Sequence, residues 1–94
     1  MMRVVGVIWL RQIVDKLEVK HGVSTDEVEE VLASQPQFRF LERGRVEGEH
    51  VYAAYGRTSA GRYLTIILIR KMGGRGLVIT ARDMDRKERR QYGR

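Results

Sequence analysis

YLTIILI, at residues 63–69, is the stretch that sets the fold of this 94-residue chain. Both of its alternating sets of side chains are apolar, with Tyr63, Ile67 and Ile69 on one face and Leu64, Ile66 and Leu68 on the other. A strand that is apolar on both faces is covered on both faces. We therefore predict that this strand lies at the centre of a sheet.

Further strands are predicted on both sides of this stretch. Residues 58–61 (Thr-Ser-Ala-Gly) indicate a hairpin turn after a strand at 51–57, and residues 73–76 (Gly-Gly-Arg-Gly) a looser hairpin before a strand at 77–82. Phe38 and Phe40 indicate an earlier strand, and the β-branched residues at 4–9 a first one. Because hairpins join consecutive strands, we expect an antiparallel sheet.

Three helices are predicted from period and capping signals. The first runs from Arg11, with its apolar residues on one helical face, and stops at Gly22. Ser24 and Glu27 form a capping box for a second helix, which ends before Pro36. A second capping box, Asp85 with Glu88, opens a short basic helix that ends near Tyr92.

The predicted order is β-α-α-β-β-β-β-α. This is an α+β fold in a single domain spanning residues 1–94, with two helices packed on one face of the antiparallel sheet. The chain has no cysteine, which excludes a disulfide scaffold and fits a cytoplasmic protein. The apolar run at 4–10 is too short to cross a membrane, so we expect no membrane association.

The positive charge is concentrated in the second half of the chain. Residues 1–49 hold seven Lys and Arg against nine Asp and Glu, whereas residues 50–94 hold eleven against three. A one-sided cationic field attracts polyanions. This asymmetry favours a nucleic acid or an acidic protein as partner over a merely solubilising charge.

The C-terminal helix carries the clearest phosphate-binding pattern. Arg86, Arg89 and Arg90 share one side of it, and Arg82 ends the preceding strand. Arginine presents a planar fork that matches phosphate oxygens, although a solvated charged face would give the same pattern. Tyrosines and arginines also interleave, which suits the stacking of unpaired bases, although the alternation places Tyr55 and Tyr63 in the core rather than on such a surface. The interleaved residues are Tyr52, Tyr55, Arg57, Arg62, Tyr63 and Arg70.

Proton transfer and metal binding have weaker signals. Lys20 and His21 lie at the end of the first predicted helix, where His21 could move protons or interact with the helix end. His50 is the only other histidine, and the two show no metal-ligand spacing. We expect neither a metal nor another cofactor.

Four separate segments share one family pattern in their order and spacing. They are residues 20–24 (Lys-His-Gly-Val-Ser) with Glu27, Val28 and residues 35–36; residues 48–52 with 56–58; residues 61–66; and residues 80–82 with 88–90 and Tyr92. Together, over roughly residues 9–92, they resemble the BrnT-type toxins of type II toxin–antitoxin systems. The resemblance implies a RelE-like fold.

The resemblance also implies a function. Such a toxin is a metal-independent endoribonuclease that inhibits translation by cutting RNA, and a cognate antitoxin neutralises it, with room for a higher-order complex of the two. We expect Arg57 and Arg82 to stabilise charge, and Lys20, His21 or Glu88 to move protons or position substrate. The expected RNA-binding residues are Arg62, Arg70, Arg86, Arg89, Arg90 and Tyr92.

Two departures from the family pattern define an alternative function. The family opens with W-D-x-x-K, whereas Trp9 is followed here by Leu10 and, at the lysine position, by Ile13. The usual serine before Ala-Arg is Thr80, and Asp83 follows Arg82. The alternative is a degenerate, non-catalytic module that binds nucleic acid or an acidic protein.

Overall fold

The computed structural model describes residues 2–93 and has an α+β architecture. One short strand precedes the first helical elements, and the other four strands follow them, with a last helix after the sheet. In chain order the elements are β1 (Val7–Ile8), α1 (Arg11–Lys16), the π-helical turn η1 (Leu17–His21), α2 (Thr25–Ala33), β2 (Gln37–Glu42), β3 (Val51–Arg57), β4 (Tyr63–Arg70), β5 (Gly76–Asp83) and α3 (Arg86–Tyr92).

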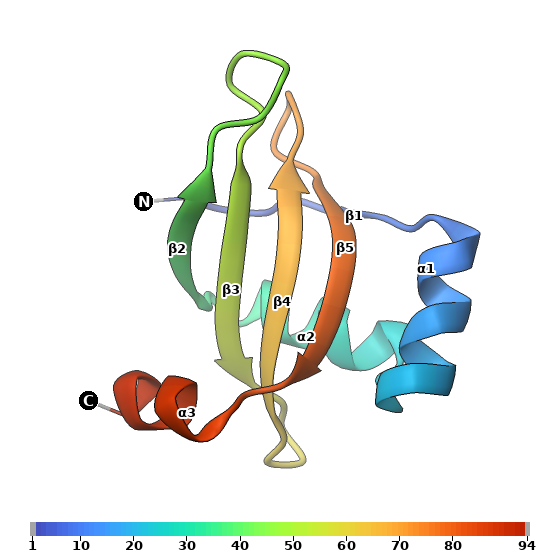
Figure 1. Cartoon of the computed structure of the whole chain (residues 1–94), viewed down its shortest axis with the longest axis vertical. Helices are drawn as coiled ribbons and strands as arrows, with labels where there is room; N and C mark the ends of the chain where they lie inside the picture. Colours follow the sequence, from blue (N-terminus) through green and yellow to red (C-terminus); the bar gives the residue numbers. More distant parts are fainter. Residues whose placement is uncertain (1, 94) are drawn as a thin grey trace.

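The strands form one sheet in the order β1-β5-β4-β3-β2, so β4 is the middle strand, as predicted. β2 to β5 are joined as antiparallel neighbours, and Figure 1 shows them side by side. Leu64, Ile66 and Leu68 are fully buried on one face of β4. The apolar pattern of residues 63–69 therefore predicted the position of this strand correctly.

The prediction of an antiparallel sheet was wrong for the first strand. β1 pairs with β5 in parallel, through Val7 opposite Gly76 and Ile8 opposite Leu77, which makes the sheet mixed. β1 is also shorter than the predicted strand at residues 4–9. Hairpins determine the direction only of strands that are adjacent in sequence, whereas most of the chain separates β1 from β5.

The helix boundaries follow from the predicted capping residues. Gly22 ends η1 in the left-handed conformation, with φ +60°, which a residue without Cβ adopts at low cost. The Ser24 hydroxyl accepts a hydrogen bond from the Glu27 backbone N–H, and the Glu27 carboxylate accepts one from the Ser24 N–H. These contacts fix the corner between η1 and α2.

The hydrophobic core lies on one face of the sheet. Leu17 of η1 and Val28, Val31 and Leu32 of α2 join a single cluster with inward residues of β3, β4 and β5. α2 comes so close to β3 that a Cβ on Gly56 would lie 2.6 Å from Val31 Cγ1. Figure 1 shows α2 behind the sheet and α3 on the near side. The face that α2 leaves open is thus the one that α3 reaches.

Candidate functional site

The short helix α3 carries the predicted arginines back over the open face of the sheet. Its start is fixed by the predicted capping box, in which Asp85 accepts from the Glu88 N–H at 2.8 Å and Glu88 accepts from the Asp85 N–H at 2.9 Å. Met84, just before it, is buried. This turn places Glu88 against Arg82, on the strand that α3 has just left.

Arg82 and Glu88 form a two-pronged ion pair. Arg82 Nη1 and Nη2 donate to the two Glu88 carboxylate oxygens at 2.7 and 2.9 Å, and the Thr65 hydroxyl donates to Glu88 Oε1 at 3.0 Å. Chiefly because of the hydrogen bonds from Arg82, the pKa of Glu88 is lowered to about 2. At neutral pH this carboxylate is ionised and a very weak base, which favours a role in holding Arg82 over one in proton transfer.

The ion pair leaves one edge of the Arg82 guanidinium open. Nη1 uses its second hydrogen on the Asp83 carbonyl, at 3.2 Å. Within residues 2–93, Nε–H and the second hydrogen of Nη2 donate to no protein acceptor. These two N–H groups lie on the same edge of the guanidinium plane, which is the geometry that binds two phosphate oxygens at once.

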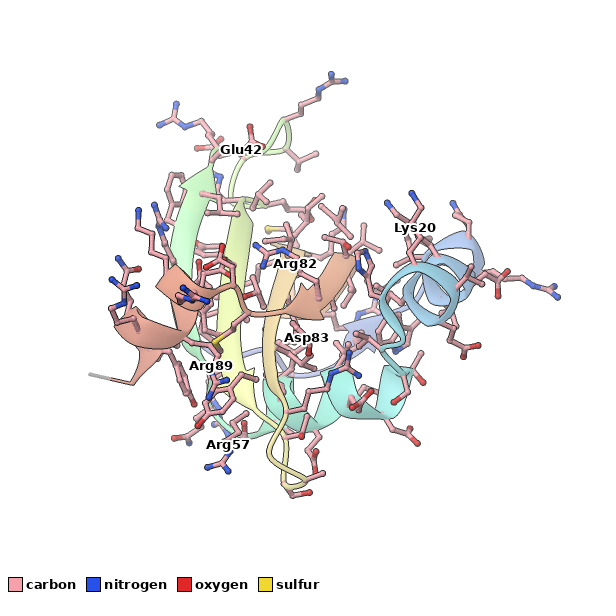
Figure 2. The ribbon with its side chains drawn as sticks, turned by 60° about the horizontal axis from the view of Figure 1, so that its bottom comes forward. Lys20, Glu42, Arg57, Arg82, Asp83 and Arg89 are labelled. Atoms are coloured by element: carbon pink, nitrogen blue, oxygen red, sulfur yellow. The ribbon has the colours of Figure 1, made fainter. Side chains whose placement is uncertain are left out.

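Tyr63, on the same face of the sheet as this pair, contacts two further arginines. The Arg89 guanidinium lies 4.0 Å from the Tyr63 ring centroid and that of Arg57 lies 5.2 Å from it. Tyr92 meets the same ring edge-on, with centroids 5.9 Å apart. Figure 2 shows Arg57, at the end of β3, on the same side of the molecule as Arg89 of α3. Cation–π contacts orient both guanidinium groups without neutralising them.

A small cavity lies between α3 and the edge of the sheet. Its volume is about 170 Å³, and it opens beside the Arg82–Glu88 pair. The lining combines aromatic rings with polar and charged side chains: Gln37, Phe38, Arg39, Tyr55, Glu88, Gln91 and Tyr92. We name the surface made by Arg57, Tyr63, Arg82, Glu88, Arg89 and Tyr92, together with this cavity, the α3 face.

Arg62, a predicted RNA-binding residue, is instead fully engaged with the protein. Its Nε and Nη2 donate to the Asp83 carboxylate at 2.7 and 3.2 Å, and Nη1 donates to Glu27. Nη1 and Nη2 also donate to the carbonyls of Gly22 and His21, at 2.7 and 3.1 Å. All five N–H hydrogens have acceptors, so Arg62 joins the β4 and β5 ends to the η1–α2 corner.

The Asp83 carboxylate binds Arg62 and not the Arg82 side chain. Its pKa is lowered, first by the hydrogen bonds from Arg62. Asp83 and Arg82 are adjacent in sequence, which is compatible with partial neutralisation of Arg82 by Asp83. Adjacent strand residues point to opposite faces, however, and Asp83 therefore turns toward the helices while Arg82 turns toward α3.

The other predicted residues are spread over the molecule. Lys20 lies on η1, and Figure 2 shows it on the opposite side from Arg57 and Arg89. The carbonyl of His21, at the end of η1, accepts a hydrogen bond from Arg62. Arg70 ends β4 far from Tyr63, which begins it, and donates to the Arg3 carbonyl at 3.2 Å. Arg86 and Arg90 are exposed on α3.

Sequence reasoning did not assign two residues to the candidate site: Thr65, which contacts Glu88 of the α3 face, and Tyr63, which belongs to that face. Thr65 is fully buried, and its hydroxyl interrupts the apolar run of β4. This polar residue within an apolar run was the sequence feature that could have pointed to it. Tyr63 was interpreted as core, yet it is half-buried and contacts two arginines. The residues that contact the Tyr63 ring come from β3 and α3, and the sequence pattern does not predict that these two elements lie close to Tyr63.

The residues that the structure describes contain neither a candidate metal cluster nor a membrane-spanning helix. Across residues 2–93, no group of three or more His, Asp or Glu side chains is arranged to hold a metal ion. None of the helices in this range is both long and apolar enough to cross a membrane.

Comparison with known proteins identifies the family. A search of curated proteins found no match to this chain. Residues 12–88, most of the chain, match the model of the family described as "Ribonuclease toxin, BrnT, of type II toxin-antitoxin system". The match confirms the resemblance noted in the four segments, and it includes Arg57, Arg82 and Glu88. The chain therefore belongs to the BrnT family of ribonuclease toxins, whose members pair with a cognate antitoxin and act on RNA.

Proposed function

We propose that this toxin cleaves RNA on the α3 face, without a metal ion, and thereby inhibits translation in the cytoplasm until its antitoxin binds. The observation that carries the proposal is the open Nε–Nη2 edge of Arg82, on the same face of the sheet as the guanidinium groups of Arg57 and Arg89 that contact Tyr63. Two cations on one aromatic ring, with a third on the same face of the sheet, suit a phosphate flanked by an unpaired base. The helix–helix–sheet order also supports a RelE-like arrangement.

The reaction that suits this face is attack of a ribose 2′-hydroxyl on the adjacent phosphate. The 2′-oxygen–phosphorus bond forms, the bond from phosphorus to the 5′-oxygen breaks, and the products are a cyclic phosphate and a 5′-hydroxyl. Negative charge builds on the non-bridging oxygens, where Arg82 and Arg57 would stabilise it. The 2′-hydroxyl proton passes to solvent water, and water returns one to the leaving oxygen.

The remaining predicted residues take different parts in this proposal. Arg86 and Arg90 would bind phosphates on either side of the cut, since both are exposed on α3. Tyr92 would stack a base at the cavity. Lys20, His21, Arg62 and Arg70 lie outside the proposed site, because their positions or contacts keep them from the α3 face.

The test is cleavage of a defined RNA by the purified chain in EDTA. We expect cutting by the wild type and its loss in Arg82→Ala. Arg43→Ala, which removes an exposed arginine from the β2–β3 loop, is the matched control and keeps full activity. Circular dichroism verifies folding of each variant. RNA that stays intact at a large excess of wild-type protein refutes the proposal.

A cell experiment tests the partner. Induction of the toxin should stop growth, and co-expression of the cognate antitoxin should restore it. We further propose that the two proteins form a higher-order complex, which light scattering after size exclusion measures directly as a mass above that of one toxin and one antitoxin. A mass equal to that one-to-one pair contradicts this last part.

One alternative has specific support. The Glu88 carboxylate offsets the charge of Arg82, and the acid and lysine of the family opening are absent after Trp9. These features favour a degenerate toxin that binds RNA without cutting it. Such a module would show salt-sensitive RNA binding in the same preparations that leave the RNA intact.

A further inference from the structure

We propose that Thr65 and Glu88 are positioning residues, which fix the Arg82 guanidinium so that its Nε–Nη2 edge faces the scissile phosphate. This inference rests on the proposed function and deepens it. It assigns a role to a buried hydroxyl, and it changes the expected role of Glu88 from moving protons to orienting an arginine.

Thr65 lies directly beneath the ion pair. It is opposite Arg82 in the β4–β5 register, so the two side chains emerge on the same face of the sheet. It is fully buried, and its hydroxyl donates to Glu88 Oε1 at 3.0 Å. A hydroxyl buried in an apolar strand costs free energy unless it has a partner, and Glu88 is that partner.

Glu88 is held from three directions. It accepts from the Thr65 hydroxyl, from the Asp85 backbone N–H and from both terminal nitrogens of Arg82. A carboxylate that is fixed at its backbone cap and at its base cannot rotate, so its plane determines the plane of the guanidinium. The Asp83 carbonyl, 3.2 Å from Arg82 Nη1, adds a second anchor.

The contribution of this network to catalysis is orientation rather than charge. A carboxylate paired with Arg82 reduces the attraction of that arginine for phosphate, which a site that needed only charge would avoid. A fixed guanidinium, in contrast, loses little conformational freedom when the transition state forms. Loosening the network should therefore reduce kcat while RNA affinity stays the same.

The decisive variant is Thr65→Val, which removes the hydroxyl and keeps both the shape and the net charge. We expect kcat to fall by about tenfold. KM and the salt dependence of RNA binding should stay within about twofold, and Thr65→Ser should restore kcat. Thr25→Val makes the same chemical change at the start of α2, where the hydroxyl has no protein partner among residues 2–93, and should leave kcat unchanged.

Three outcomes overturn the inference: an unchanged kcat in Thr65→Val, a rise in KM in place of the fall in kcat, or a Thr65→Ser variant as impaired as Thr65→Val. If Thr65→Val does not fold, Glu88→Gln provides the same test, because it preserves side-chain length, and full activity in that variant refutes the inference. Failure of the proposed function gives a different result, in which the wild type leaves RNA intact or Arg82→Ala cleaves RNA normally.

Discussion

Arg62 provides the sharpest separation between a structural and an RNA-binding arginine. Its five N–H hydrogens bind two carboxylates and two carbonyls, which tie β4 and β5 to the η1–α2 corner. Arg62→Ala leaves the carbonyls of His21 and Gly22 without these donors, at a cost of about 1 kcal/mol each. The side chains of Glu27 and Asp83 are 30% and 63% exposed. Water screens these two ion pairs, so together they add only about 1 kcal/mol.

The expected loss is thus about 3 kcal/mol in the free energy of unfolding. For a domain of this size it corresponds to a fall in Tm of about 12–24 °C. Urea titration and thermal melting followed by circular dichroism measure both quantities, with Arg43→Ala as a control that changes stability by less than about 0.5 kcal/mol. A loss below about 1 kcal/mol in Arg62→Ala refutes the structural role. If RNA affinity falls instead while stability is unchanged, Arg62 contacts RNA, as the sequence had suggested.

Two further predictions concern charge. The pKa of Glu88 is lowered to about 2, so its ion pair adds full stability above its unfolded-state pKa near 4.5 and loses it as the pH falls toward 2. Urea titrations between pH 2 and 7 should show Glu88→Gln losing about 2 kcal/mol less than wild type over that range, and equal losses would contradict the assignment. Arg57→Ala and Arg89→Ala should each make the plot of log affinity for single-stranded RNA against log salt shallower by about 0.7. Filter binding at several salt concentrations measures this slope, and an unchanged slope in both variants would remove these arginines from the RNA surface.

The elements that sequence reasoning predicted well are those fixed by local physics. The central position of β4 follows from its two apolar faces, because any other place in the sheet would expose one of them. The turn at Gly22 and the caps at Ser24 and Asp85 depend on contacts within three or four residues. Such contacts form whatever the rest of the chain does, so their sequence signals are reliable.

The parallel pairing of β1 had no local signal. Its two residues meet β5 through backbone hydrogen bonds, including one from the Gly76 N–H to the Gly6 carbonyl at 2.8 Å. Backbone groups are the same in every residue, so neither the partner nor the direction is encoded in the side chains of residues 4–9.

For the site, arginine spacing predicted where charge would gather but not which arginine was available. Arg86, Arg89 and Arg90 share a helix side in sequence, yet only Arg89 has turned onto Tyr63. Lys20 and His21 were grouped with Arg82 because all three suit RNA cleavage. Both Lys20 and His21 lie on η1, where Figure 2 shows Lys20 on the opposite side of the molecule from Arg89 of α3, and where the His21 carbonyl accepts from Arg62.

The difference between Arg62 and Arg82 lies in the donors that each has left. Both are half-buried, both pair with a carboxylate, and both pKa values are raised by that pairing. Arg62 donates all five of its N–H hydrogens to protein acceptors. Each hydrogen bond that it made to RNA would therefore break one of these internal hydrogen bonds. Arg82 donates three of its N–H hydrogens to protein acceptors, and its other two lie on a single edge of the guanidinium. A phosphate that binds this edge therefore adds hydrogen bonds without breaking any internal one. Because the same residue type produces both outcomes, counting unsatisfied donors separates the arginine that we propose to bind RNA from the structural one, where counting charges does not.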